Sequence, residues 1–426
     1  MSSMKSEILE KIKDFPITPY LDDICKTLKD SPSHFLILTA ETAAGKSTVL
    51  PLALLEEFEG RMIITEPRRL AVLGVANRLS DLYEAAGGKN TIGYKIHLES
   101  HITEQTRMEV VTEAILVRQL QEDPSLEGYN LVVLDEFHER SVNTDMALAF
   151  LKEAMQLRDD LYVIVMSATI ETARLQKYLF DVPVMKIPGR QFPVKMIYEP
   201  EKSLLSAVYQ AIRITDGAAK GQQNILVFLP GISDIRKAQE TLLESGDFGP
   251  ESDIEICVLH SSISLEEQKK VITSGKRRVI LSSAIAETSL TVPGVTCVID
   301  SGLARVNRLD LNTGMEKLTT EPESEFSAEQ RAGRAGRLAP GTCIRMWAQT
   351  DPRVKTLPPE ILRTDLVPLV LECSERGVYS ADGIDWLDSP TAAAWRSSCT
   401  LLQTLGMLGG GPARNAAASG CGSTGT

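Results

Sequence analysis

The chain has 426 residues, which is too long for one ordinary hydrophobic core and predicts two or three domains. Its formal net charge of −12 excludes indiscriminate binding to nucleic acid through a generally basic surface, although it leaves room for a locally basic groove. Aromatic content is only 5%, as in folds that alternate strands and helices, and nothing in the composition indicates a fibrous protein.

The lengths of the apolar runs and the spacing of the cysteines indicate the cellular compartment of the protein. The longest apolar runs have the length of strands, and the first residues lack an apolar signal core, so we expect a cytoplasmic protein without a membrane partner. Seven cysteines show no Cys-x-x-Cys spacing. We expect them to be reduced and mostly buried, and to form neither a disulfide framework nor a zinc site.

Strand and helix patterns alternate through the first part of the chain and predict a parallel sheet. Three prolines and a glycine interrupt this pattern in residues 183–193, where we place a boundary that ends a first domain of residues 1–190. Helices are expected at residues 21–28 and 48–58, and strands at residues 34–39, 61–65, 108–112, 131–134 and 161–167.

The alternation then resumes and predicts a second α/β domain at residues 191–357, with a hairpin projecting from residues 306–320. Residues 358–408 have a helical pattern and are expected to form a small third domain. Residues 409–426 contain no large apolar side chain and are expected to be disordered. In the second domain we expect strands at residues 224–229, 254–260, 278–282, 295–300 and 342–347, and helices at residues 233–243 and 265–272.

A phosphate-binding loop is predicted where the first strand leads into a helix. Gly45, Lys46 and Ser47 follow that strand, so backbone N–H groups, a lysine ammonium and a Mg²⁺-binding hydroxyl would meet a nucleotide there. Ala40 and Ala43 stand where such loops often carry glycine, which bears on nucleotide affinity. A chance Gly-Lys-Ser at a helix start is the alternative for this motif taken alone.

Two adjacent carboxylates follow the apolar run of residues 131–134, which fits a strand buried on both faces. Asp135 is predicted to hold Mg²⁺ through its water shell, and Glu136 to polarise the attacking water. His138 and Glu139 alone would not make a zinc site, because no matching His or Cys set lies elsewhere in the chain.

Two further stretches carry chemistry. Residues 167–169, Ser-Ala-Thr, follow the strand at 161–167 and lie at the nucleotide edge of a parallel sheet, although Ser and Thr at such positions usually just cap the next helix. Arg331, Arg334 and Arg337 are spaced by three and are predicted to line one helix face. Such a face suits arginine fingers that one domain supplies to a nucleotide on another, and a solvated basic helix is the alternative.

Taken together and in this order, these stretches resemble the DEAH-box helicases of superfamily 2, and most closely their bacterial HrpB type. The resemblance covers roughly residues 30–408. It implies two tandem RecA-like parallel-sheet domains followed by a partial winged-helix domain, with ATP and Mg²⁺ between the two sheets and single-stranded nucleic acid across their top. The motifs that carry it are residues 40–48, 65–69, 111–116, 135–141, 167–169, 227–231, 259–262, 286–291 and 330–337.

The resemblance also implies a role for individual positions. It assigns catalysis to Glu136, Gln330, Arg334 and Arg337, and Mg²⁺ binding to Ser47, Asp135 and Glu136. It assigns nucleotide binding to Thr42, Gly45, Lys46, Ser47, Thr48 and Arg78, coupling to His138, Ser167 and Thr169, and contacts with the nucleic-acid backbone to Arg68, Arg69, Thr112 and Thr288. Backbone contacts of this kind give grip without reading sequence.

The expected function is therefore an NTP-dependent helicase or translocase that acts as a monomer on single-stranded nucleic acid, RNA in preference to DNA. The sequence departs from the family at Ser283 and Ala284, and its end lies inside the winged-helix region, which reads as a shortened C-terminus. These departures keep open a nucleic-acid-binding clamp with little NTPase activity. A third possibility, a P-loop ATPase of transport or assembly, is disfavoured by residues 330–337.

Overall fold

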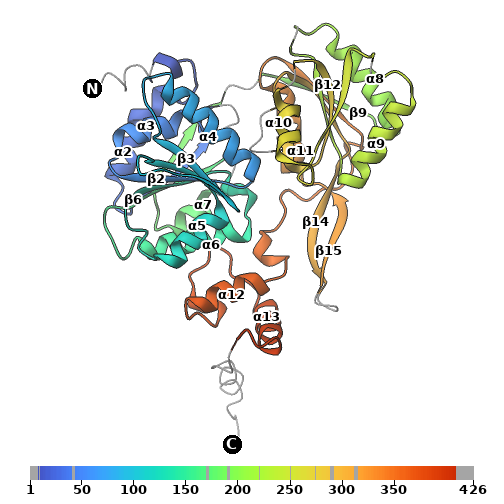
Figure 1. Ribbon diagram of the computed structural model, residues 1–426. Helices are drawn as coiled ribbons and strands as arrows, with labels where there is room; N and C mark the ends of the chain where they lie inside the picture. Colours follow the sequence, from blue (N-terminus) through green and yellow to red (C-terminus); the bar gives the residue numbers. More distant parts are fainter. Residues whose placement is uncertain are drawn as a thin grey trace, which may run out of the picture.

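The computed structural model describes residues 8, 10–40, 44–168, 172–189, 192–219, 221–249, 251–273, 275–287, 292–310 and 315–408. Thr42, Ala43, Thr169, Thr288 and the tail at 409–426 lie outside the described residues. The described chain forms two parallel sheets flanked by helices, a projecting hairpin and a helical C-terminal segment (Figure 1). Among its helices, none combines the length and apolar character needed to cross a bilayer.

The first sheet contains eight strands in the order β4-β3-β5-β2-β6-β7-β1-β8. Every neighbouring pair is parallel except β3 and β4. Its central strands were predicted from the sequence and are confirmed. The bounds are β1 Phe35–Ala40, β2 Arg61–Glu66, β3 Ile92–Ile96, β4 Glu99–His101, β5 Met108–Thr112, β6 Tyr129–Leu134, β7 Tyr162–Ser167 and β8 Val184–Ile187.

Two apolar layers enclose this sheet, because successive side chains of a strand point to opposite faces. In β1, Phe35 and Ile37 join one core, and Leu36 and Leu38 join the other. The helices α5, α6 and α7 cover the first face, and α2, α3 and α4 cover the second (Figure 1). Their bounds are α2 Leu21–Asp30, α3 Val49–Glu57, α4 Arg69–Glu84, α5 Glu113–Glu122, α6 Val142–Ala154 and α7 Thr172–Tyr178.

The second sheet contains six parallel strands in the order β11-β12-β10-β13-β16-β9. Its strands are β9 Val194–Tyr198, β10 Asn224–Phe228, β11 Ile254–Leu259, β12 Arg277–Ser282, β13 Val295–Asp300 and β16 Gly341–Arg345. The helices that flank it are α8 Leu204–Thr215, α9 Ile232–Glu244, α10 Leu265–Thr273 and α11 Glu325–Gly333. The two sheets together are the predicted pair of RecA-like α/β units.

The predicted hairpin is present as a separate two-stranded antiparallel sheet. Its strands are β14 Leu303–Asp310 and β15 Met315–Pro322, and their register pairs Val306 with Thr319. In Figure 1 it projects from the second sheet toward the level of the C-terminal helices. The tip at residues 311–314 lies outside the described residues.

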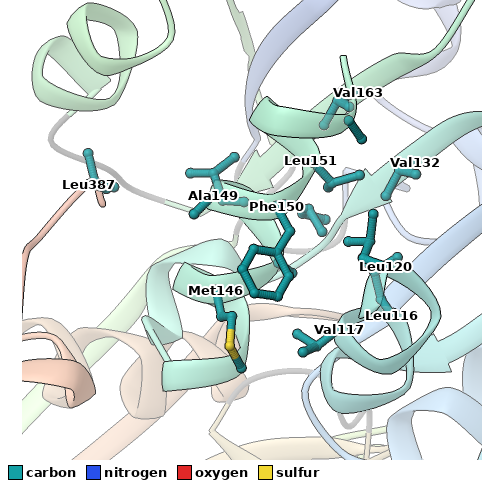
Figure 2. Packing of buried hydrophobic residues seen from close by; sticks show 14 of the residues in the cluster. Leu116, Val117, Leu120, Val132, Met146, Ala149, Phe150, Leu151, Val163 and Leu387 are labelled. Atoms are coloured by element: carbon teal, nitrogen blue, oxygen red, sulfur yellow. The ribbon is translucent and has the colours of Figure 1, made fainter. Parts of the chain in front are cut away.

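The C-terminal segment does not build a separate core. Its helices α12 Val367–Glu375 and α13 Ala392–Thr404 contribute Leu369, Val370, Trp395 and Leu402 to the same apolar cluster as Phe150 of α6. Figure 2 shows this cluster and includes Leu387 near Ala149. The expected small third domain is therefore continuous with the core of the first domain. Residues 358–408, all described, contain helices and short turns but no strand.

The strands expected from the sequence did not include β3, β4, β8 and β9. Strand β4 has three residues, all polar, so it carries no apolar signal. Strand β8 lies within the proline-rich stretch that we used as a boundary, and it pairs with β1 as the edge of the first sheet. An edge strand tolerates flanking prolines, because only one of its sides must supply ladder hydrogen bonds.

Candidate nucleotide site between the two sheets

The turn from β1 to α3 has the geometry of a phosphate-binding loop. Gly45 adopts a φ of +95°, and a Cβ at this position would lie 2.9 Å from the Val49 side chain, so a larger residue is disfavoured. Its carbonyl accepts hydrogen bonds from the amides of Thr48, Val49 and Leu50 at 3.3, 2.8 and 3.3 Å. The loop therefore turns sharply into the helix and brings Lys46 and Ser47 to the carboxyl end of the sheet.

Strand β7 lies between β1 and β6, so the loop and the acidic strand end meet at one edge. The Lys46 ammonium lies 3.4 Å from Asp135 Oδ1 and 3.1 Å from Glu136 Oε1. The Ser47 hydroxyl donates to Asp135 Oδ2 at 2.5 Å. The structure thus brings together four of the predicted site residues in a cluster that is almost closed to solvent.

The backbone at Glu136 has an uncommon conformation, with a φ of 49° in the left-handed region. For a residue with a Cβ, this conformation costs about 1–2 kcal/mol. The Glu136 amide donates to Asp135 Oδ1 at 2.7 Å, and both carboxylates contact the Lys46 ammonium. Strain of this kind is typical of functional sites, where surrounding contacts keep the residue in place.

The charges of the cluster follow from burial and pairing. Burial, the largest single influence, favours the neutral form of Glu136, but the charge and hydrogen bond of Lys46 together with other positive charge nearby outweigh it and lower the pKa of Glu136 to about 2. Burial lowers the pKa of His138, so its ring is neutral at pH 7. The ring nitrogen Nδ1 of His138 lies 3.4 Å from Glu136 Oε2. The site therefore presents an ionised carboxylate and a neutral imidazole side by side.

Sequence reasoning missed a third carboxylate in this cluster. Glu66, the last residue of β2, is 1% exposed. Burial and the charges of Asp135 and Glu136 raise the pKa of Glu66 well above its usual range. The signal was available, because β2 neighbours β6 in the parallel sheet and both strands end at the same edge.

The second domain contributes two arginines. Helix α11 ends at Gly333 and a short 3₁₀ turn follows, in which the Arg334 guanidinium donates to the carbonyl of Glu287 at 2.9 Å. Arg334 and Arg337 both interact electrostatically with Glu136 of the first domain. Positive charge from one sheet therefore faces the acidic strand end of the other.

The prediction that three arginines line one helix face is wrong for Arg331. Because α11 ends before Arg334, the spacing of three no longer keeps the three side chains on one side. Arg331 instead enters the second domain, where its guanidinium contacts Asp300 at 2.9 Å and Glu323 at 2.6 Å. It serves as an internal counter-ion.

Direct contacts join the two domains beside the site. Arg68 donates to the Ile285 carbonyl of the second domain at 3.1 Å and pairs with Glu139 of its own domain at 3.3 Å. The His138 ring packs edge-on against Phe326, with ring centroids 5.2 Å apart. The segment after Asp135 and Glu136 is thus part of the interface between the domains.

The remaining predicted positions are placed as follows. Ser167 is fully buried at the end of β7, and Thr112 is the half-buried residue that precedes α5. Arg69 and Arg78 are exposed on α4, and Gln330 is half-buried on α11. The roles of these side chains, and those of Thr42, Thr169 and Thr288 outside the described residues, stay predictions.

The oxygen atoms at the strand ends fit a nucleotide-bound Mg²⁺. Among the described residues, no three His, Cys, Asp or Glu side chains gather as a metal site of their own. A nucleotide-bound Mg²⁺ does not need a cluster of three protein ligands, since it keeps several waters and takes one or two protein oxygens together with phosphate oxygens. Ser47 and Asp135 would hold the ion, with Glu136 next to it.

Comparisons with known proteins agree with this geometry. Residues 21–178 match the DEAD/DEAH box helicase family, and residues 204–339 match the helicase conserved C-terminal domain. The chain is 40% identical over 414 residues to the ATP-dependent RNA helicase HrpB of Escherichia coli, covering 94% of this chain and 50% of that protein. It is 34% identical to the ATP-dependent RNA helicase HrpA of the same organism, covering 93% of this chain and 31% of that protein.

Solved structures give the same result. The crystal structure of Escherichia coli DEAH/RHA helicase HrpB superposes with a TM-score of 0.83, covering 93% of this chain and 51% of that chain. The chain spans about half the length of HrpB and less than a third of HrpA's. With both domain families matched and residues of both domains meeting at one interface, the chain carries the two domains of a DEAD/DEAH box helicase and is similar to HrpB over almost its whole length.

Proposed function

We propose that this chain is an NTP-dependent motor that moves along single-stranded nucleic acid and separates strands. The observation that carries the proposal is the convergence of charges from both domains. On the first domain, the Lys46 ammonium lies 3.4 Å from Asp135 and 3.1 Å from Glu136. From the second domain, Arg334 and Arg337 act electrostatically on Glu136. Such a site is complete only when the domains are together, so nucleotide binding and hydrolysis can be linked to domain movement.

Each group has a chemical task that its surroundings support. Lys46 neutralises phosphate charge, and Ser47 and Asp135 hold Mg²⁺, which when bound spreads the charge that develops on the phosphate oxygens. Glu136 is ionised and orients a water for attack on the terminal phosphate, helped by Gln330. Arg334 and Arg337 stabilise the negative charge of the transition state from the other domain.

The nucleic acid is assigned by chemistry and by relatives. Arg68, Arg69, Thr112 and Thr288 would contact the phosphate backbone, which gives grip without sequence selection. RNA is proposed over DNA because the relatives HrpB and HrpA are RNA helicases. We also propose ATP as the main nucleotide, a monomeric state and a cytoplasmic location.

The test is steady-state ATP hydrolysis by the purified 426-residue chain, with and without single-stranded RNA or DNA. We expect nucleic acid to raise the rate, and Glu136→Gln to lower kcat by roughly 10²- to 10⁴-fold, because it removes the group that accepts a proton from water. Glu122→Gln, an exposed site on α5, is the matched control. A flat rate at the Glu136→Gln level would overturn the motor and favour a nucleic-acid-binding clamp.

A further inference from the structure

A segment of residues 353–365, called the strap here, leaves the second domain and crosses to the first. Near its start, the carbonyls of Val354 and Lys355 accept hydrogen bonds from the amides of Glu325 and Phe326 at 2.9 and 3.0 Å. These two amides belong to the first turn of α11. The strap is therefore anchored on the helix that leads to the site arginines.

The middle of the strap is bonded to the chain just after the catalytic acids. The Glu360 amide donates to the Arg140 carbonyl at 3.0 Å, and the Glu360 carboxylate accepts from the Val142 amide at 3.0 Å. Arg140 has a φ of 48°, the second left-handed residue in this short stretch after Glu136. Residues 135–142 are called the acid loop. Glu360 is therefore hydrogen-bonded to the part of the acid loop that has a strained, left-handed backbone.

The end of the strap is bonded to the β14–β15 hairpin. The Arg363 carbonyl accepts from the Leu309 amide at 2.9 Å, and the Arg363 side chain donates to the Asn307 carbonyl at 3.1 Å. The Asp365 amide donates to Glu316 Oε1 at 2.9 Å. A hairpin outside the main sheets is marginally stable alone, so these bonds help to fix its position relative to the strap.

A single tight turn separates the two attachments. The Glu360 carbonyl accepts hydrogen bonds from the amides of Arg363 and Thr364 at 3.0 and 3.1 Å, and from the Thr364 hydroxyl at 3.0 Å. A turn closed in this way moves as one piece. A shift of the hairpin is therefore passed to Glu360 without being absorbed by slack chain.

The acid loop is supported from its other side by the first domain. Ser141 and Thr144 donate to the two carboxylate oxygens of Glu113 at 2.6 and 2.5 Å. Glu113 is the first residue of α5 and follows Thr112, a proposed nucleic-acid contact. The loop thus lies between this support and the strap, and the strap is one of its contacts outside the first sheet, beside those of His138 with Phe326 and Arg140 with Asp388.

We propose that Glu360 is a positioning residue through which the β14–β15 hairpin acts on the acid loop and so on Glu136. The proposal rests on the function proposed above and deepens it, since it names the contact by which a nucleic acid that displaces the hairpin alters hydrolysis. Spatial continuity alone does not establish coupling, so the test must measure an energetic link between the two ends of the strap.

The first measurement compares Glu360→Ala with Glu360→Gln in RNA-stimulated ATP hydrolysis by the full chain. Glutamine keeps an oxygen that accepts from Val142, whereas alanine removes it. We expect alanine to lower the stimulated kcat by about five- to tenfold, the effect of losing one partly buried hydrogen bond, with the KM for ATP unchanged. Glutamine should stay within about twofold of the parent chain. Glu375→Ala, exposed on α12, is the control.

The second measurement is hydrogen exchange of residues 137–145 in Arg363→Ala, without nucleotide or RNA. Arg363 has no recorded bond to these residues in the described structure, so faster exchange there requires transmission through the strap. Glu360→Ala combined with Arg363→Ala should show no further loss of stimulation, as expected for one path.

Three outcomes would overturn the proposal: unchanged exchange in Arg363→Ala, equal losses in the alanine and glutamine variants, or additive losses in the double variant. A parent chain that RNA does not stimulate would contradict the proposed motor function instead. The exchange experiment still decides the coupling in that case, because it uses neither ATP nor RNA.

Discussion

Two buried charge clusters stand at the ends of central strands, one in each domain, and they differ in how completely their polar atoms are satisfied. In the second domain, Asp300 ends β13, and its two carboxylate oxygens accept from the Gly302 amide, the Arg331 guanidinium and the Trp347 indole at 3.0, 2.9 and 3.2 Å. In the first domain, the Lys46 ammonium is held by its ion pairs with Asp135 and Glu136 and, like one oxygen of Glu66, makes no hydrogen bond among the described residues. In the second domain, Oε1 of Glu323 is in the same state, but Asp300 and Arg331 are satisfied.

The difference separates structure from function. A buried charge that is fully hydrogen-bonded has no capacity left for a ligand. Its removal leaves the partner charge buried without a counter-ion in a low-dielectric interior. A cluster with unused donors and acceptors costs stability unless a ligand completes it. Because three donors satisfy Asp300, the pair of Asp300 and Arg331 serves to hold the second domain together. The unused capacity of Lys46 and Glu66 agrees with the nucleotide site proposed above.

The largest expected effect comes from Arg331→Met. It leaves Asp300 and Glu323 buried without their cation and should lower the stability of the second domain by about 3–5 kcal/mol. Hydrogen exchange checks the location, because amides of β13 should lose protection while those of β6 keep it. Arg118→Met, which breaks an exposed pair with Glu122, is the control. An equal loss of amide protection in β13 and β6 of Arg331→Met, or no loss in either, would contradict the assignment.

Glu113 lies between the two clusters in character, since it is buried and accepts hydrogen bonds but has no cation. Burial raises the pKa of Glu113 to about 7. The hydrogen bonds from Ser141 and Thr144 lower this pKa, and the negative charges of Glu139 and Glu360 raise it. The folded chain therefore keeps a proton that the unfolded chain loses near pH 4, so stability falls as pH rises through 7.

Relative to Glu113→Gln, the parent chain should lose about 3 kcal/mol of stability between pH 5 and pH 8. Thermal unfolding at several pH values measures this difference. Glutamine still accepts one hydrogen bond and does not titrate, so its profile should be flatter. Parallel profiles for the two chains would show that Glu113 is ionised in the folded state and that the raised pKa is wrong.

The smallest effect is expected on the hairpin, where a charge pair is exposed. Arg308 of β14 reaches diagonally to Glu321 of β15 and donates two hydrogen bonds of 2.6 and 2.7 Å, since the register places Lys317 opposite Arg308. The two side chains are 44% and 27% exposed. A double-mutant cycle with Arg308→Gln and Glu321→Gln should give about 1 kcal/mol or less, and the value should fall as salt is raised. A coupling of several kcal/mol would place this pair with the buried clusters.

Much of the fold was predictable because its signals are local. Apolar runs of strand length alternate with helical patterns, and the polar residues that follow the strands must meet at one edge of a parallel sheet. That rule was enough to bring Lys46 together with Asp135 and Glu136. The local signals did not reveal β4, which has no apolar side chain. They also did not lead us to include Glu66, the buried last residue of β2, because that strand was expected to end one residue earlier.

The sequence by itself determined the strand–helix order, the Gly-Lys-Ser loop and the acidic strand end, since each depends on neighbouring residues. Only the tertiary structure decided where Arg331 points, that the C-terminal helices share the core of the first domain, and that Glu360 meets Arg140. The physical reason is that these contacts join residues far apart in the chain. Their partners are chosen by how helices end and cores pack, which no local pattern records.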